Sequence, residues 1–167
     1  MRSLLAVPAA AVLLAGTSAA TVVATAKPAS AAPASASAAS ALPSCPGVRV
    51  MRQPIYTNRK VKAAYIHVFY DKRTGRACAF VNSAYATWGI RKHMSLRLWH
   101  CVGLVNGYCL TPLATPSRSG WYSGRSGTLT VNLSKGCVKA VGTVSWGGQR
   151  GESTTKAFCV RSSGGWV

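Results

Sequence analysis

Apolar side chains recur at every second position in much of the chain after residue 60. Residues 61–70, VKAAYIHVFY, contain two interleaved sets that are both largely apolar: Ala64, Ile66, Val68 and Tyr70, and Ala63, Tyr65, His67 and Phe69. Successive side chains of a β-strand point to opposite faces, so this pattern predicts a strand that is covered on both sides. Such a strand is typical of the interior of a β-sandwich.

A tight turn follows this strand. Residues 71–75, DKRTG, end on a glycine and lead into a second apolar run, ACAFV, at residues 77–81. A loop of this length that closes on glycine predicts a β-hairpin. We expect Asp71 to accept hydrogen bonds from the turn backbone. Three cations would then lie together at the solvated tip: Lys72, Arg73 and Arg76.

The later segments continue the same pattern. In residues 93–101, HMSLRLWHC, the apolar Met94, Leu96 and Leu98 alternate with other residues, which predicts one core face and one wet face. Further strands are predicted within residues 128–133, 137–146 and 154–160. Because no stretch sustains a helical period, the predicted fold is all-β, a small disulfide-stapled antiparallel β-sandwich or barrel.

The segments before the domain differ in composition. Residues 1–26 place Arg2 before a short apolar run and then small residues, which is typical of a secretory signal peptide. Residues 27–44 are almost entirely Ala, Ser and Pro, which predicts a disordered linker. The β domain is predicted over residues 45–167. We therefore expect a secreted, extracellular protein without an integral membrane segment.

Cysteine usage agrees with export. All the cysteines fall in the predicted domain: Cys45, Cys78, Cys101, Cys109, Cys137 and Cys159. Disulfides persist outside the cell, and the sequence alone leaves their connectivity open. Our hypothesis is the sequential pairing, first with second, third with fourth and fifth with sixth. The alternative that Cys45 carries a lipid fits less well, because Pro43 is unusual in a lipoprotein cleavage box and five cysteines would remain.

The charge balance limits the kind of partner. The chain has 20 Lys and Arg against 2 Asp and Glu, a formal net charge of +18, and its sequence pI is about 10.5. Such a field attracts an acidic secreted protein or an extracellular polyanion, and it keeps an unpartnered chain monomeric. We predict no small-molecule substrate.

Few residues are available for catalysis. Asp71 falls in a predicted turn and Glu152 in a predicted loop, so a pair of carboxylates in one cleft is not expected. The three histidines, His67, His93 and His100, lack the spacing of a metal site, and no GxSxG elbow is present. We predict no cofactor, no metal and no enzymatic activity.

Cations beside aromatic residues mark candidate binding positions. Arg91 and Lys92 precede the strand at residues 93–101, and Arg97 and Trp99 share its wet face. This combination holds flexible polyanions in many proteins. The predicted partner-binding residues are therefore these: Lys72, Arg73, Arg76, Arg91, Lys92, Arg97 and Trp99. The other tryptophans, Trp88, Trp121, Trp146 and Trp166, lie near strand ends, where we expect them to pack against the core margin.

The order of these segments resembles a known family. Cys45, then AYIHVFYDKRTGRACAFV, MSLRLWHC, SGWYSGRSGTLTVNLSKGCVKAVGTVSWGG and AFC are similar to the spore-associated protein A family of small secreted proteins from filamentous, spore-forming bacteria. The resemblance covers roughly residues 45 to 160. It implies a chain without an agreed enzymatic activity. This sequence departs from the family by adding Cys101 and Cys109 and by being far more basic.

A second resemblance concerns the layout of a tail plus a small β domain. This layout is similar to the small adaptor subunits of secreted antibacterial umbrella toxin particles, which bridge a lectin-bearing subunit and a long toxin polypeptide. It implies a bridging role.

The leading hypothesis is therefore a secreted, strongly basic, non-catalytic binding or adaptor module that docks on an acidic partner, within a secreted antibacterial toxin complex. One alternative is a protease inhibitor that presents residues 102–108, VGLVNGY, between Cys101 and Cys109, with Leu104 or Tyr108 offered to the enzyme. Another is a cationic protein that binds the cell envelope or another polyanion.

Overall fold

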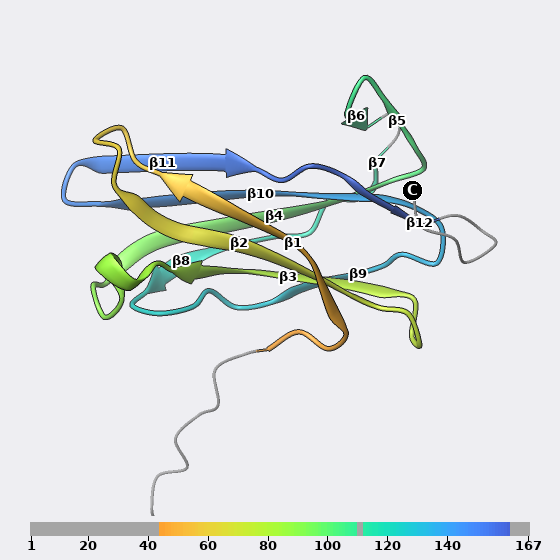
Figure 1. Cartoon of the computed structure of the whole chain (residues 1–167), viewed down its shortest axis with the longest axis horizontal. Coiled ribbons are helices and arrows are strands. Elements are labelled where there is room, and N and C mark those ends of the chain that lie inside the picture. The colour runs from red at the N-terminus through yellow and green to blue at the C-terminus, as the bar shows by residue number, and fades with distance from the viewer. Residues whose placement is uncertain (1–43, 110–111, 161–167) are drawn as a thin grey trace, which may run out of the picture. The chain divides into compact units, whose positions relative to one another are not determined.

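The computed structural model describes residues 44–109 and 112–160, and the predicted signal peptide, nearly all of the predicted linker and residues 161–167 lie outside this part. The described strands form two antiparallel sheets and a small hairpin (Figure 1). The four-stranded sheet has the order β1 (Val48–Tyr56), β2 (Lys62–Asp71), β3 (Arg76–Ser83) and β9 (Leu129–Asn132). The six-stranded sheet has the order β11 (Gln149–Thr154), β10 (Gly136–Trp146), β4 (Lys92–Cys101) and β7 (Pro112–Ala114), with β12 (Phe158–Val160) beside β10 and β8 (Ser117–Tyr122) beside β4. The hairpin pairs β5 (Leu104–Val105) with β6 (Tyr108–Cys109), and a 3-10 turn, η1 (Tyr85–Thr87), follows β3.

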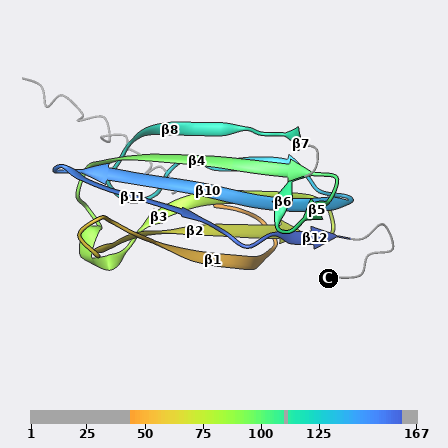
Figure 2. The same cartoon turned by 90° about the horizontal axis from the view of Figure 1, so that it is seen from above.

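The two sheets pack face to face as a sandwich. Seen from above, β8, β4, β10 and β11 form one layer and β3, β2 and β1 the other (Figure 2). The predicted all-β, antiparallel, disulfide-stapled fold is confirmed, and of its two forms the structure has the sandwich, because the sheets do not close into a barrel. Among the described residues, no helix has the length and apolar character needed to cross a membrane.

The core follows the alternation that the sequence shows. From β2, Ile66 and Val68 point inward and are fully buried. From β4, the inward side chains are Met94, Leu96 and Leu98, as predicted. The two layers approach most closely at Gly142 of β10, where an added Cβ would lie 2.8 Å from Cγ1 of Ile66. Any larger residue at this position would push the sheets apart.

The second apolar set of β2 is covered differently from our expectation. Tyr65, His67 and Phe69 point away from the core, yet His67 is buried and the other two are half-buried. Cationic side chains cover this face instead of a further layer: Arg52 of β1 lies over Tyr65, and Arg125, from the loop before β9, lies over Phe80. The doubly apolar pattern therefore reflects one protein core and one face that is covered by long cationic side chains.

All six cysteines are paired, and the sequential pairing is confirmed. The bonds are Cys45–Cys78, Cys101–Cys109 and Cys137–Cys159. The first ties the start of the described chain to β3, and the third joins β10 to β12. The second closes the β5–β6 hairpin at the end of β4. Three disulfides are consistent with an extracellular protein.

The sequence interpretation missed several strands at the sheet edges. Glu152 was expected in a loop but belongs to β11, which pairs with β10 through the Gly147–Gly148 turn. Both glycines have positive φ angles, 52° and 73°, which suits a two-residue hairpin turn. Strands β1 and β8 were also not predicted. Conversely, the strand predicted at residues 154–160 is interrupted: Thr154 ends β11, residues 155–157 lie outside strands, and Phe158–Val160 form β12.

Candidate functional site

The predicted partner-binding residues lie in three separate places. Lys72, Arg73 and Arg76 are exposed at the β2–β3 turn, as expected. There Asp71 accepts hydrogen bonds from the Arg73 backbone N–H at 2.9 Å and from Oγ1 of Thr74 at 2.8 Å. The Thr74 hydroxyl, followed by the backbone amides, lowers the pKa of Asp71 below its ordinary value.

Arg91 lies at the other end of β3 from Arg76. It follows η1, which begins directly after β3, while Arg76 is the first residue of that strand. Arg97 and Trp99 lie on the outer face of the six-stranded sheet, whereas the outer face of the four-stranded sheet carries Arg76. The predicted residues therefore do not converge on a single site.

Lys92 differs from the prediction, because it is not a surface cation. Its side chain is 0% exposed, and its ammonium group donates hydrogen bonds to the backbone oxygens of Thr87 at 2.5 Å and Ile90 at 2.6 Å. Burial lowers the pKa of Lys92 from its ordinary value. The alternation of β4 explains this position, since Lys92 is in phase with the inward residues Met94 and Leu96. Lys92 fastens η1 to β4 and is not available to a partner.

A groove of about 590 Å³ crosses the outer face of the six-stranded sheet. We call it the hydroxyl groove, and it is lined by Ser95, Leu96, Arg97, Trp99, Ser117, Arg118, Ser119, Val141, Thr143, Glu152 and Thr154. Its hydroxyl groups come from four adjacent strands, and Ser95 Oγ and Thr143 Oγ1 are 2.6 Å apart. Glu152 forms an exposed ion pair with Arg150 at 3.9 Å. Arg97 and Trp99 thus lie together in a concave surface, although their predicted binding role stays a prediction.

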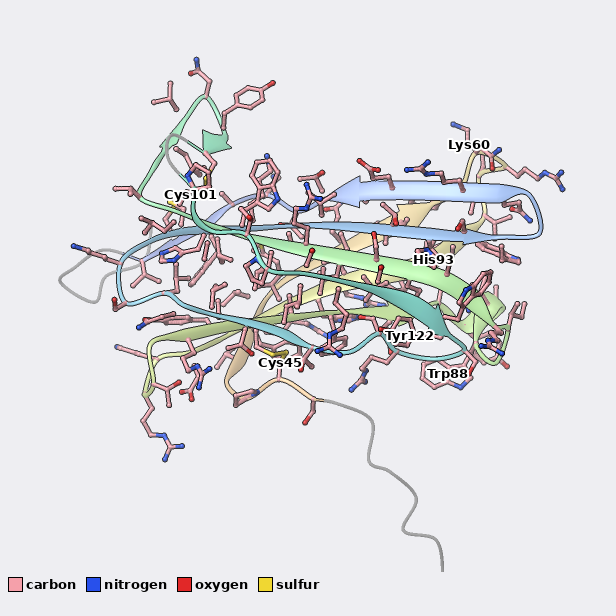
Figure 3. The ribbon with its side chains drawn as sticks, turned by 180° about the vertical axis from the view of Figure 1, so that it is seen from behind. Cys45, Lys60, Trp88, His93, Cys101 and Tyr122 are labelled. Carbon is pink, nitrogen blue, oxygen red and sulfur yellow. A yellow bond between two sulfur atoms is a disulfide. The ribbon has the colours of Figure 1, made fainter. Side chains whose placement is uncertain are left out.

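Large apolar side chains are exposed at one end of the sandwich. We call this the η1 end, and it comprises Tyr85, Trp88, Ile90 and Trp121. Tyr85 is 99% exposed. The hydroxyl of Thr87, which donates to the Ala63 backbone oxygen, holds η1 against β2. Trp88 and Tyr122 lie near each other at this end (Figure 3). The expected packing role of the tryptophans is correct for Trp146, which contacts the core, but wrong for Trp88 and Trp121, which are exposed. Trp166 lies outside the described residues.

A second group of exposed apolar side chains lies at the opposite end of β4. We call it the hairpin end, and it comprises Val102, Val105, Tyr108 and Leu113. The β5–β6 hairpin stands away from both sheets, at the end opposite η1 (Figure 1). Its turn has positive φ angles at Asn106 and Gly107, 50° and 77°, which suits a two-residue hairpin turn with the sequence Asn-Gly. Nζ of Lys139 donates to the Gly107 backbone oxygen at 3.1 Å and steadies the hairpin.

The outer face of the four-stranded sheet carries arginines on aromatic rings. We call it the arginine face, and it comprises Arg49, Arg52, Arg125, Tyr65, His67, Phe69 and Phe80. Cζ of Arg52 lies 3.9 Å from the Tyr65 ring centroid, and Cζ of Arg125 lies 4.2 Å from that of Phe80. Such stacking is favourable when the ring is partly desolvated.

His67 lies at the centre of the arginine face. Its ring stacks on Phe80 with centroids 5.1 Å apart. Burial, and then the nearby charges of Arg49, Arg52 and Arg125, lower the pKa of His67 from 6.5 to about 4. The imidazole is therefore neutral at neutral pH. Sequence reasoning missed this face, because Arg125 comes from a distant loop and the only available signal was the second apolar set of residues 61–70.

No family model, curated protein or solved structure matches this chain. Within residues 44–109 and 112–160, no three His, Cys, Asp or Glu side chains gather in a way that could hold a metal ion. What the surface offers chemically is therefore cationic charge, exposed aromatic rings and hydroxyl groups.

Proposed function

We propose that this protein is a secreted, non-catalytic adaptor that docks on an acidic partner protein. The observation that carries the proposal is the placement of exposed apolar side chains at two separate ends. Tyr85 and Trp121 belong to the η1 end, whereas Val105 and Tyr108 belong to the hairpin end. The ten residues of β4 separate these ends, which corresponds to about 30 Å. Two distant surfaces suit a bridging protein.

The composition of both ends suits protein docking. Tyr, Trp and Arg are enriched among the residues that dominate binding energy at protein interfaces. The η1 end has Tyr85, Trp88 and Trp121 with the exposed Arg91 beside them. The hairpin end presents Tyr108, which is 77% exposed, on a turn that a disulfide constrains. A constrained loop loses less conformational freedom on binding, which favours affinity.

The charge of the chain supports an acidic partner. Arg91 is exposed at the η1 end and Lys139 contacts the hairpin. The chain's two acidic side chains, Asp71 and Glu152, are already engaged with the β2–β3 turn and with Arg150. A complementary acidic surface would be steered toward this protein and oriented by its field. The apolar ends would then slow the dissociation of the complex.

Two further observations favour binding over catalysis. Asp71 and Glu152 lie on different sheets, and all six sulfurs are paired, so neither a carboxylate pair nor a thiolate nucleophile is assembled from them. The resemblance to the adaptor subunits of secreted umbrella toxin particles supports a place in such a complex. A bridging role is what that resemblance implies.

Copurification from the native culture supernatant tests the proposal. The full chain should recover an acidic protein in a defined ratio that persists at moderate salt. Tyr85→Ala with Trp121→Ala should weaken one contact by roughly thirtyfold or more, as for interface hot spots. Val105→Ala with Tyr108→Ala should weaken a different contact, so each pair serves as the control for the other. Recovery of every anionic species, with elution by salt alone, would contradict the adaptor role.

Protease inhibition is the second candidate function, and the exposure of Tyr108 on the disulfide-closed hairpin favours it. An inhibitor of this kind would present residues 102–108 to a protease that prefers aromatic or aliphatic residues. Titration of chymotrypsin-like and subtilisin-like proteases with the purified protein distinguishes the two functions. Stoichiometric inhibition that Tyr108→Ala abolishes would support the inhibitor.

A further inference from the structure

The arginine face has a cross-strand row at its centre. Arg52 of β1 pairs with His67 of β2, and His67 pairs with Phe80 of β3. Arg125 stacks on Phe80 at one end of this row, while the guanidinium of Arg52 lies over the neighbouring Tyr65 ring. Neighbouring strands are about 4.8 Å apart, which places the Cα atoms of Arg52 and Phe80 roughly 10 Å apart.

Both guanidinium groups are held in defined orientations. Arg52 lies on the Tyr65 ring, and Nε of Arg125 donates to Oδ1 of Asn82 at 3.2 Å. A guanidinium that stacks on a ring keeps its N–H groups in the plane of the fork, where they match the oxygens of a phosphate. Because the orientation is fixed in advance, less conformational freedom is lost when an anion binds.

The polar group beneath the arginines lacks a partner. His67 is only 8% exposed, and its Nδ1 atom is buried without a hydrogen bond. Ser83 Oγ and Trp99 Nε1 are also buried without a hydrogen bond, so this feature is not specific to the arginine face. A neutral imidazole this deeply buried does not contact a bound anion, so His67 reports on the field of the arginines above it.

Acidic side chains are remote from this row. Asp71 lies at the β2–β3 turn and Glu152 lies on the six-stranded sheet. The charged groups that lower the pKa of His67 are Arg49, Arg52 and Arg125. The positive field at the centre of the arginine face is thus opposed by neither carboxylate.

We propose that the arginine face is a binding site for phosphate groups, with Arg52 and Arg125 as the two forks and Arg49 as a supporting charge. The rings offer a poor stacking platform for bases, because Phe80 and His67 are buried, Arg52 lies over the Tyr65 ring, and Phe69 is only partly exposed. The site would therefore recognise the phosphates of a polymer and not its bases. This site is separate from the apolar ends, so it does not rest on the proposed function.

Calorimetric titration of the full chain with inorganic phosphate tests the site. Arg52→Met and Arg125→Met, made together, remove both charges and keep an apolar contact with each ring. We expect the phosphate affinity to fall at least about tenfold, as when charge-assisted hydrogen bonds are lost. The matched control is Arg150→Met with Lys156→Met, which removes two exposed cations that are not on this face. Equal losses in the two double variants would overturn the proposal.

The His67 imidazole supplies a second readout. Oligothymidylate is a suitable probe, because its phosphodiesters stay anionic and its bases do not titrate near the pKa of His67. Bound phosphate would offset the field of the arginines, so the pKa of His67 should rise from about 4 in NMR titrations. An unchanged His67 titration under saturating probe would also overturn the proposal.

Three polymers distinguish the possible sources of phosphate. Oligothymidylate and poly(glycerol phosphate) share the phosphodiester group, and the tighter binder of the two identifies a nucleic acid or a wall polymer as the source. Poly-glutamate carries carboxylates instead. Its displacement of phosphate at equal charge concentration would show that the face recognises negative charge in general, which contradicts a phosphate site.

Discussion

The outer faces of the two sheets are built from different side chains, although both sheets alternate core and surface positions in the same way. On the four-stranded sheet, His67 and Phe80 are buried under arginines. On the six-stranded sheet, small hydroxyl side chains such as Ser95 and Thr143 line an open groove. One outer face therefore contributes to folding as a second apolar layer, whereas the other contributes little and leaves a concave surface free. A high net charge alone does not reveal this difference.

The largest expected effect concerns Phe80, whose ring lies beneath Arg125 on the arginine face. Phe80→Ala removes a buried side chain that stacks with His67 and Phe69. We expect the free energy of unfolding to fall by about 3 to 5 kcal/mol, as for other buried phenylalanines. Urea denaturation measures this change. A loss below about 1 kcal/mol would show that the face is an ordinary solvated surface.

The disulfides provide a second comparison between the four-stranded sheet and the hairpin at the end of β4. Cys45–Cys78 closes a chain segment with a sequence separation of 33 and lies on the four-stranded sheet, whereas Cys101–Cys109 has a separation of 8. Loop-closure entropy predicts losses of roughly 4 kcal/mol and roughly 2.5 kcal/mol when each pair is replaced by alanines. Thermal denaturation of the two double variants provides the test. A larger loss for the short hairpin would contradict the entropic account.

The pH dependence of stability follows from His67. Its pKa is lowered from 6.5 to about 4 on folding, so the unfolded chain binds a proton more readily in this window. Stability is then full above about pH 6.5 and falls by about 3 kcal/mol as the pH drops to about 4. Asp71 acts at lower pH, because its pKa lies below 3.8. His67→Phe should abolish the decline between pH 6.5 and 4 in denaturation curves, and an unchanged slope in this variant would assign the decline to another group.

The smallest effect is expected on the six-stranded sheet. Thr143→Val removes the hydrogen bond with Ser95 and keeps the shape of the side chain. We expect a loss of about 1 kcal/mol or less. If this variant cost as much as Phe80→Ala, the two outer faces would not differ in the way described above. The same urea titration, run on both variants, gives the comparison directly.

The central strands and the disulfides were predictable from the sequence, whereas the edges were not. Strands β2, β4 and β10 are long and alternate clearly, so their inward faces can be read from the chain. Edge strands pair on one side and tolerate residues that weaken the pattern, such as Pro54 in β1. Glu152 was placed in a loop for the same reason, because β11 is short, polar and rich in hydroxyl groups.

The surfaces were predictable only in part. Arg97 and Trp99 share a face because two residues of one strand must do so, and this was read correctly. Lys92 was misassigned because a lysine beside a strand is usually exposed. The neighbouring sequence does not show that the backbone oxygens of Thr87 and Ile90 accept hydrogen bonds from its ammonium group. The stacking of Arg125 on Phe80 depends on the packing of a distant loop against β3. Contacts of that kind follow from tertiary structure and not from spacing.

The salt dependence of partner binding tests the adaptor proposal most directly. Surface plasmon resonance of the wild-type chain with the copurified acidic partner should show an association rate that falls with salt and a dissociation rate that changes little. The reason is that electrostatic attraction speeds the encounter of the two proteins, whereas apolar contacts slow the dissociation of the complex. Tyr85→Ala with Trp121→Ala should speed dissociation and leave association nearly unchanged. If the dissociation rate instead rises steeply with salt and neither apolar end affects it, the protein is a general polyanion binder and the adaptor account is wrong.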